Sequence, residues 1–399
     1  MIKQYKGHYD ITLQTLRLKD QNGNTPVFFF ACSTMADRCA GKTYSSAKML
    51  LKNYFSHGKY LQNIINDPIY KARSGKFILF TRRITDLGKI ATGVFSDVLA
   101  FEKEFEGYTI QEITTDKISK IVLTHFEDFI DYDKDGNPKD PEEKRIDEEI
   151  GWVVPIAVKS DLFKRIGKTL FEADVMYFDE FQPTKDGEYL PNEVKDFWII
   201  YETVARGHDP DDTTNDGGDS RYIPVILCSN TISIDNPYYY YTNLSGQIDS
   251  NTKIYRGNRV VYERCTVEGL ADKRKEAPIN VALARLIEEE ANNTYVNDDA
   301  SLVAKPDQKW GRALYLATLD FGNESYALFE YPNKNLYYLC RKVDPNFPYK
   351  YAMFIDNNKK NAPIFKASPL LRDVKKRIFD GHLRCQDQMI QNKIIKYFT

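Results

Sequence analysis

The 399-residue chain lacks the marks of several large protein classes. Its six cysteines are scattered without a Cys-x-x-Cys pair, which argues against a disulfide framework and a zinc site and favours a reducing compartment. No apolar run approaches the roughly 18 residues of a membrane span. Residues 1–6 do not resemble the start of a signal peptide. We therefore expect a soluble, cytoplasmic protein with no membrane partner.

Charge is nearly balanced over the whole chain but unevenly distributed along it. The formal net charge is −2, yet residues 127–149 carry eleven acidic and four basic side chains, whereas residues 366–399 carry eight Lys or Arg and three Asp. A basic segment of this kind is typical of contacts to phosphate backbones, although it is often only a solvated helix face. The length and the 42% hydrophobic content predict a globular protein of two or more domains.

The most informative stretch is an octapeptide between an apolar run at residues 27–31 and a helical pattern at residues 44–54. It reads Ala36, Asp37, Arg38, Cys39, Ala40, Gly41, Lys42, Thr43. The order strand, loop, helix predicts a phosphate-binding loop, with backbone N–H groups and Lys42 on the phosphates of ATP and the Thr43 hydroxyl on Mg²⁺. The stretch departs from G-x-x-x-x-G-K-[ST] only at Ala36, which requires a negative φ and a reshaped start of the loop.

A second motif lies downstream, where the apolar residues 175–178 run into Asp179 and Glu180. Buried parallel strands are continuous apolar runs, and ligands in open α/β sheets bind at the carboxyl ends of the strands. Asp179 is thus expected to face Mg²⁺, and Glu180 to polarise an attacking water. Alone, the motif also fits a strand that ends in a solvated acidic turn. Together with Lys42 and Thr43 it predicts an ATP hydrolysis site.

The remaining pattern predicts the domain organisation. Apolar runs at 77–80 and 223–227 join those at 27–31 and 175–178 in a predicted parallel α/β sheet with right-handed crossovers, and the polar, Gly-rich residues 208–218 predict a surface insertion. Residues 268–297 turn charged and helical, as expected of a linker. Strand patterns at 313–319, 326–331 and 336–341, a hairpin turn at 332–335 and helices up to residue 399 then predict a small α+β domain.

The acidic block also contains a possible calcium loop. The residues from Asp131 to Glu142 fit D-x-[DN]-x-[DN]-G-x₅-E at every named position. However, Pro138 and Pro141 interrupt the loop, and residues 118–124 and 150–156 look like two paired strands rather than flanking helices. The favoured interpretation is an acidic hairpin tip.

Six sequence blocks occur together in an order and rough spacing that we recognise. They are Gly-Trp-Val-Val-Pro at 151–155, Phe-Asp-Glu-Phe at 178–181, Tyr-Leu-Pro-Asn-Glu-Val at 189–194, Leu-Cys-Ser-Asn at 227–230, Asn-Pro-Tyr at 236–238 and Phe-Asp-Gly-His-Leu-Arg at 379–384. With these blocks, most of the chain resembles the phi-29-like phage DNA packaging ATPases. The Asp-Glu-Phe block with the Pro-Asn-Glu-Val that follows is far more specific than a phosphate loop.

The resemblance implies a fold and a set of partners. It implies an additional-strand, conserved-glutamate P-loop ATPase motor domain at 1–265, a small helical linker domain at 266–301, and a ribonuclease H-like nucleic-acid-binding domain at 302–399 that has lost its nuclease carboxylates. It further implies a homo-oligomeric ring, expected to be a pentamer. That ring would act in the host cytoplasm at the portal protein of an empty capsid and drive double-stranded DNA inward. Whether a structural packaging RNA takes part is left open.

The resemblance also assigns roles to single residues. It gives Asn230 a place beside the γ-phosphate, where the residues alone equally allow a strand-ending turn. Arg206 resembles the arginine finger that acts in trans, although from the sequence alone it would be an ordinary surface arginine. Arg82 and Arg83 resemble a family pair without an assigned role. Lys164, Arg165 and Lys168 are all candidates for a basic position between subunits.

Two other classes of function stay open at this point. Asp320 follows a predicted strand where a nuclease could bind metal, so a terminase-like protein with an active nuclease is one alternative. The other is a P-loop kinase or nucleotide switch that does not translocate, for which DNA would not stimulate hydrolysis.

Overall fold

The chain divides into two compact units. The first comprises residues 1–231 and 252–294, and the second comprises residues 232–251 and 295–399. The computed structural model describes residues 8–34, 40–115, 117–130, 142–158, 170–183, 189–206, 221–231, 233–234, 236–249, 252–267, 281–282, 302–322, 324–353 and 368–398. No helix in these ranges is long and apolar enough to span a membrane. Each of the five cysteines that they contain is a free, buried thiol.

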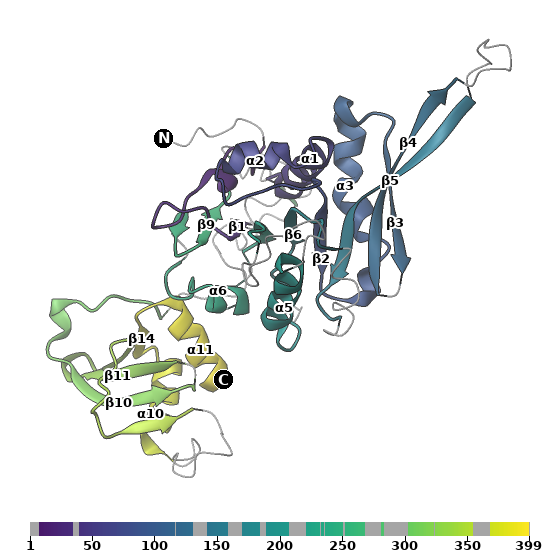
Figure 1. The fold of residues 1–399 in the computed structure, drawn as a ribbon. Coiled ribbons are helices and arrows are strands. Elements are labelled where there is room, and N and C mark those ends of the chain that lie inside the picture. The colour runs from purple at the N-terminus through teal and green to yellow at the C-terminus, as the bar shows by residue number, and fades with distance from the viewer. Residues whose placement is uncertain are drawn as a thin grey trace, which may run out of the picture. The chain divides into compact units, whose positions relative to one another are not determined.

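The first unit alternates strands with helices, as the apolar runs predict (Figure 1). Its helices are α1 (Lys42–Phe55), α2 (Lys59–Ile65), α3 (Ile90–Phe101) and α5 (Glu193–Ala205), with short 3₁₀ turns η1 (Thr15–Arg17), η2 (Ile84–Asp86) and η3 (Lys103–Phe105). Its strands are β1 (Phe28–Ser33), β2 (Phe77–Thr81), β3 (Thr109–Thr115), β4 (Ile118–Phe129), β5 (Glu142–Pro155), β6 (Val175–Asp179), β7 (Val225–Asn230), β8 (Ile254–Arg256) and β9 (Val260–Arg264).

These strands form one nine-stranded sheet in the order β3-β4-β5-β2-β6-β7-β1-β9-β8. Six consecutive strands of this sheet run parallel, namely β5, β2, β6, β7, β1 and β9. The predicted α/β class is therefore confirmed for the centre of the sheet. The four predicted strands are all parallel members of this centre, to which the structure adds antiparallel strands, β3 and β4 at one edge and β8 at the other. Antiparallel edge strands can face water, and most residues of β3 are exposed, which explains why this strand is not an apolar run.

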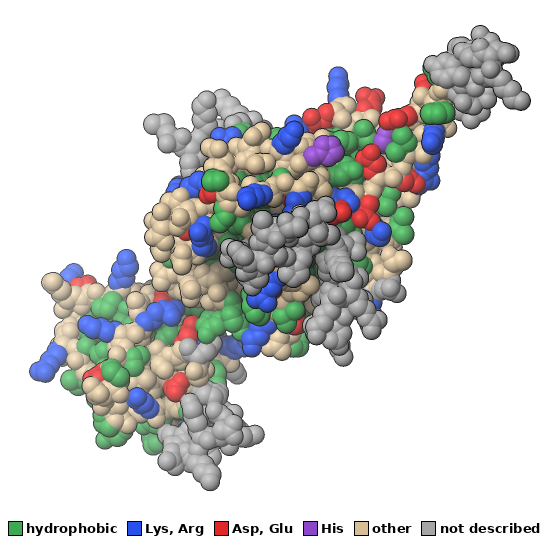
Figure 2. Space-filling model, in the orientation of Figure 1, with side chains coloured by type: hydrophobic (Ala, Val, Ile, Leu, Met, Phe, Trp, Pro, Cys, Tyr) green, Lys and Arg blue, Asp and Glu red, His purple; other side chains and the backbone are tan. Residues whose placement is uncertain are grey.

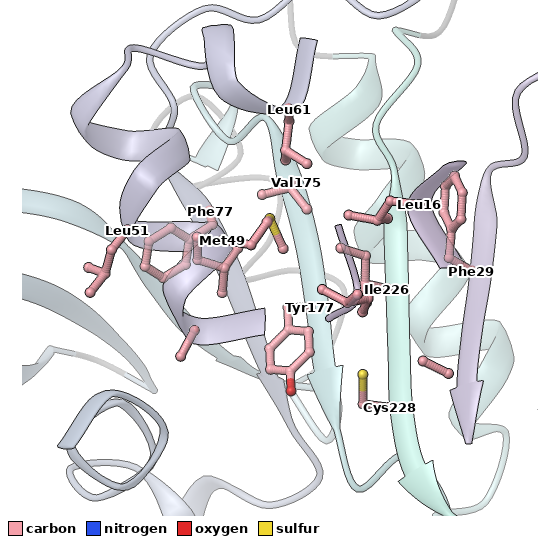
Figure 3. Close-up of a cluster of buried hydrophobic side chains, with 14 of the residues drawn as sticks. Leu16, Phe29, Met49, Leu51, Leu61, Phe77, Val175, Tyr177, Ile226 and Cys228 are labelled. Carbon is pink, nitrogen blue, oxygen red and sulfur yellow. The ribbon is translucent and has the colours of Figure 1, made fainter. Parts of the chain in front are cut away.

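Helices cover both faces of this sheet. On one face, side chains of α1 and α2 such as Met49 and Leu61 pack with Phe77, Val175 and Ile226 in a continuous buried cluster (Figure 3). On the other face, Phe197 of α5 lies with its ring centroid 4.7 Å from that of Phe80. A parallel sheet between two helical layers buries both of its faces, which explains the uninterrupted apolar runs of its central strands.

The acidic block belongs to a long hairpin that extends beyond the rest of the sheet (Figure 1). Strands β4 and β5 pair antiparallel from Ser119–Val153 out to Phe129–Glu142, so the predicted pairing of residues 118–124 with 150–156 is confirmed. Residues 131–141 lie outside the described ranges. The calcium-loop alternative therefore stays untested.

The second unit is a five-stranded sheet with helices at its carboxyl-terminal end. Its order is β13-β10-β11-β12-β14, in which β10, β11 and β12 are antiparallel neighbours and the two outer strands join in parallel. The predicted three-strand meander, its turn at 332–335 and the closing helices are confirmed. The elements are α6 (Pro237–Tyr241), η4 (Gln308–Trp310), β10 (Leu314–Asp320), β11 (Ser325–Tyr331), η5 (Pro332–Lys334), β12 (Leu336–Cys340), β13 (Lys350–Ala352), α10 (Pro369–Phe379), β14 (Leu383–Cys385) and α11 (Gln388–Phe398).

The domain boundaries predicted at 265/266 and 301/302 stay predictions. Apart from two helical residues at 281–282, the predicted linker beyond residue 267 lies outside the described ranges, as does the insertion at 208–218. One difference is visible, since residues 232–251 group with the second unit although they precede the predicted first boundary.

Candidate active site

The candidate site lies where three neighbouring parallel strands of the first unit end. Strands β6, β7 and β1 are adjacent and end at Asp179, Asn230 and Ser33. Asp179 and Asn230 line a pocket of about 830 Å³, whose wall also includes Gly41, Lys42, Thr43, Glu180 and Ser229. Residues far apart in the sequence are therefore brought together at the edge where open α/β sheets bind their ligands.

The start of α1 contributes the phosphate-binding part of the motif. Gly41 precedes the helix with φ 96°, a left-handed conformation that favours glycine, and Lys42 and Thr43 form the first turn. The N–H groups of a first helical turn have no partner within the helix and attract anions. Ala36, Asp37, Arg38 and Cys39 lie outside the described residues, so their predicted contacts stay predictions.

Thr43 and Asp179 are directly connected. The Thr43 Oγ1 donates to Asp179 Oδ2 over 2.6 Å, which links the first turn of α1 to the end of β6. Burial raises the pKa of the Asp179 carboxyl, and the nearby Glu180 adds to this rise, while the Thr43 hydrogen bond and Lys42 oppose it. A hydroxyl beside a carboxylate is the oxygen donor set that Mg²⁺ takes in P-loop proteins.

Lys42 is the first member of a polar chain along the strand ends. Its Nζ donates to the Ser33 Oγ, which in turn donates to Asn230 Oδ1 over 3.1 Å. Lys42 is largely buried but lines the pocket, and this chain of hydrogen bonds fixes the position of its charge. The sequence reasoning found Lys42 and Asn230 but missed Ser33. Its position two residues after the apolar run at 27–31 was the available signal.

Glu180 lines the pocket and is exposed to solvent. It follows the last residue of β6 and has φ 52°, a left-handed conformation that costs a non-glycine residue about 1 kcal/mol or more. A second cavity, of about 740 Å³, is lined by Glu180, Asp179 and Thr43 together with Arg82 and Arg83. Glu180 thus lines both cavities.

Several lining residues were not anticipated from the sequence. His8, Tyr44, Lys48, Phe101 and Glu102 extend the pocket away from Asp179. Hydrogen bonds from Lys48 and from Tyr44 lower the pKa of the Glu102 carboxyl, so this end of the pocket carries a fixed ion pair. These residues belong to no short motif, which is why sequence reasoning did not find them.

Arg206 is not among the residues that line this pocket. It caps the C-terminus of α5 and forms an ion pair with Glu202, and 68% of its side chain is exposed. Lys164, Arg165 and Lys168 fall outside the described ranges, so the choice between them is not tested.

Comparison with known proteins gives the family of the chain. The DNA packaging protein of Bacillus phage phi29 is 22% identical over 262 residues, which cover 62% of this chain and 70% of that protein. The corresponding protein of Bacillus phage B103 is 22% identical over 251 residues, covering 60% and 71%. The fold matches a chain of the bacteriophage phi29 genome packaging motor assembly with a TM-score of 0.60 at 17% identity, over 98% of this chain and 99% of that one. Residues 141–399, more than half of the chain, match the podovirus DNA encapsidation protein (Gp16) family, and the chain belongs to this family.

Proposed function

We propose that this protein is the ATPase of a phage DNA packaging motor, which uses hydrolysis of Mg²⁺-bound ATP to move double-stranded DNA into an empty capsid. The observation that carries the proposal is the pocket at the ends of β1, β6 and β7. It joins Lys42 and Thr43 of one motif, Asp179 and Glu180 of a second, and Asn230, to which the family resemblance gave a role. Family membership supports the same function.

The residues present fit ATP and Mg²⁺. The left-handed Gly41 and the first turn of α1 offer N–H groups, and Lys42 offers a charge, to phosphate oxygens. The Thr43 hydroxyl and the Asp179 carboxylate, 2.6 Å apart, would hold Mg²⁺. When bound, the metal neutralises charge on the phosphates during transfer.

Glu180 is the proposed general base. Both Asp179 oxygens already accept hydrogen bonds, Oδ2 from the Thr43 hydroxyl and Oδ1 from the Glu180 N–H. The neighbouring Glu180 is exposed, so its carboxylate is the one placed to accept a proton from water. Asn230 lines the same pocket and is held by Ser33, which suits it to orient that water or the γ-phosphate.

We further propose that the motor is a ring, in which Arg206 completes the site of a neighbouring subunit. Its exposure at the end of α5 supports a role outside its own chain, because an arginine finger must reach the γ-phosphate across an interface. A pentameric ring seated on a capsid portal protein remains part of the proposal. The use of a packaging RNA remains an open question within it.

The second unit is proposed to hold DNA without cutting it. Arg372, Lys375 and Lys376 are exposed on α10 and offer charges to a phosphate backbone. In the described residues, Asp320 is part of no group of three His, Cys, Asp or Glu side chains that could hold a metal ion. The relation of this unit to ribonuclease H stays a proposal.

Phosphate release from ATP, measured with and without linear double-stranded DNA, tests the function. The wild-type protein is expected to hydrolyse ATP faster with DNA. Glu180→Gln should still bind nucleotide but lose about 100- to 10,000-fold in turnover, because an amide cannot take the proton. The exposed Glu106→Gln is the matched control and should behave as wild type.

Three results would contradict the proposal in different ways. Equal hydrolysis by wild type and Glu180→Gln would remove Glu180 as the base. Hydrolysis that DNA does not change would favour a nucleotide switch. Nicking of plasmid DNA in Mg²⁺ or Mn²⁺ would favour a terminase-like protein with an active nuclease.

A further inference from the structure

A segment near the N-terminus lies against the end of the phosphate-binding loop. The Tyr9 N–H donates to the Ala40 carbonyl over 2.8 Å, directly before Gly41. Two residues later, the Ile11 N–H donates to the Ser45 Oγ of α1 over 3.4 Å. The Ser45 N–H in turn donates to the Gly41 carbonyl over 2.8 Å. The segment therefore contacts the chain just before and just after Gly41.

The hydrogen bond from Tyr9 fixes the peptide group between Ala40 and Gly41. In a planar trans peptide the C=O and the N–H point in opposite directions, so a carbonyl that faces Tyr9 turns the Gly41 N–H away from Tyr9. Among the described residues, none accepts a hydrogen bond from this N–H, and Gly41 lines the pocket. Backbone N–H groups at this place in a phosphate-binding loop bind phosphate oxygens. The contact with Tyr9 thus leaves the Gly41 N–H for a phosphate oxygen.

The other end of Tyr9 is held by a buried carboxyl group. The Tyr9 hydroxyl donates to Glu263 Oε2 over 2.9 Å, and the Thr15 Oγ1 of η1 donates to the same oxygen over 2.5 Å. All three residues are buried, and Tyr9 belongs to the apolar core of the first unit. Burial raises the pKa of the Glu263 carboxyl, and the hydrogen bonds from Thr15 and Tyr9 oppose this rise. Burying a carboxyl group is costly unless it is hydrogen-bonded, so the three side chains hold one another in place.

Glu263 connects these side chains to the strand that precedes the loop. It lies on β9 opposite Ala31 of β1, and the Cys265 N–H donates to the Cys32 carbonyl over 2.6 Å. Strand β9 therefore holds the chain before the loop by pairing with β1. It holds the end of the loop through Glu263 and Tyr9. Both sides of the loop are thus fixed to one strand.

We propose that Tyr9 and Glu263 are positioning residues of the nucleotide site. Tyr9 directs the Gly41 N–H at the phosphates through the Ala40 carbonyl, and Glu263 holds Tyr9 where this requires it. The inference rests on the proposed ATPase function, in which Gly41 and Lys42 bind the phosphates. Neither Tyr9 nor Glu263 is among the residues that line the pocket, so both act on nucleotide binding rather than on the hydrolysis step.

Nucleotide affinity of the full-length protein tests the inference. A fluorescent ADP analogue with Mg²⁺ measures affinity without hydrolysis, and phosphate release at saturating ATP measures kcat. Tyr9→Phe removes only the hydroxyl. We expect it to lower ADP affinity about 10-fold, as for the loss of one hydrogen bond to a charged group, with kcat within about twofold of wild type. Glu263→Gln keeps one acceptor oxygen and should lower ADP affinity in the same sense.

A second buried tyrosine supplies the matched control. The Tyr222 hydroxyl donates to the Pro26 carbonyl over 2.6 Å, and Tyr222 is also buried in the first unit. Tyr222→Phe should lower the melting temperature about as much as Tyr9→Phe, because each loses one buried hydrogen bond, but it should leave ADP affinity unchanged. In a Glu263→Gln background, Tyr9→Phe should weaken ADP binding little further, since both changes act through the same contact.

Distinct outcomes overturn the inference and the function on which it rests. Wild-type ADP affinity in Tyr9→Phe, or an equal loss of affinity in Tyr222→Phe, would overturn the positioning role. Fully additive losses of affinity in the double variant would do the same. If Tyr9→Phe does not fold, Glu263→Gln carries the comparison with Tyr222→Phe. Failure of the function itself would instead appear as equal turnover of wild type and Glu180→Gln.

Discussion

The two units differ in where their polar side chains come together. In the first unit, polar residues from the ends of three parallel strands and the start of α1 converge on one pocket. In the second unit, whose central strands are antiparallel, charged residues pair with each other over the sheet. Arg377 donates to Asp373 over 2.9 Å and lies 3.8 Å from the Tyr337 ring, and Lys393 donates to Glu324 over 2.9 Å.

This difference follows from strand direction. All carboxyl ends of parallel strands meet at one edge, so side chains distant in sequence are collected there, whereas antiparallel neighbours send their ends to opposite edges. We therefore expect substitutions in the first unit to change the chemistry. Substitutions in the second unit should change only the strength of binding.

The largest effect is expected at Arg206, and it tests whether the pocket is complete within one chain. Arg206→Ala should lower ATP turnover on the order of a thousand-fold, because charge on the γ-phosphoryl oxygens loses its partner. If the arginine acts in trans, mixing this variant with Glu180→Gln should restore part of the turnover, since each supplies what the other lacks. Phosphate release by mixed assemblies measures the recovery.

The control and the contrary outcome for Arg206 are simple to define. Lys195→Ala removes an exposed cation from the same helix and should leave turnover near the wild-type level. No recovery in assemblies shown to contain both variants would mean that Arg206 acts within its own chain.

A smaller effect is expected at Lys42, and it acts on binding rather than turnover. Lys42→Ala removes a buried charge and leaves the Ser33 Oγ without the donor that holds it toward Asn230, so ATP affinity should fall by about 10- to 100-fold. A fluorescent ATP analogue measures the affinity. Lys59→Ala, an exposed lysine on α2, is the control. Unchanged affinity in Lys42→Ala would remove this loop from the phosphate site.

Sequence reasoning succeeded where a pattern maps directly onto local geometry. The apolar runs that end at Asp179 and near Asn230 are strands of the central sheet, and the residues that follow them lie at its binding edge. The order of strands could not be read from the runs, because pairing depends on contacts distant in sequence. For the same reason the antiparallel edge strands β3 and β8 were missed.

The candidate site shows the same limit. Lys42, Thr43, Asp179 and Glu180 belong to spaced motifs and were predicted, whereas the Arg82–Glu193 pair joins residues 111 positions apart. No local pattern marks that pair, although Arg82 had attracted attention through the family resemblance. The contact between Arg82 and Glu193 could be found only in the folded structure.

The smallest effect is expected on α10 of the second unit, where the contrast between the two units predicts a change in DNA affinity alone. Arg372, Lys375 and Lys376 are exposed there, and Figure 2 shows Lys and Arg side chains spread over the visible surface of this unit. Each phosphate contact releases counterions, so changing all three to Gln should weaken binding to double-stranded DNA a few-fold and reduce the slope of log affinity against log salt by up to about three. Basal ATP turnover without DNA should stay unchanged.

The matched control for the α10 variant changes the exposed Lys59, Lys71 and Lys103 of the first unit to Gln. Fluorescence anisotropy over a series of salt concentrations measures both quantities. If the α10 variant kept the wild-type salt slope, these side chains would be available for a protein contact instead, such as an acidic surface of a neighbouring subunit.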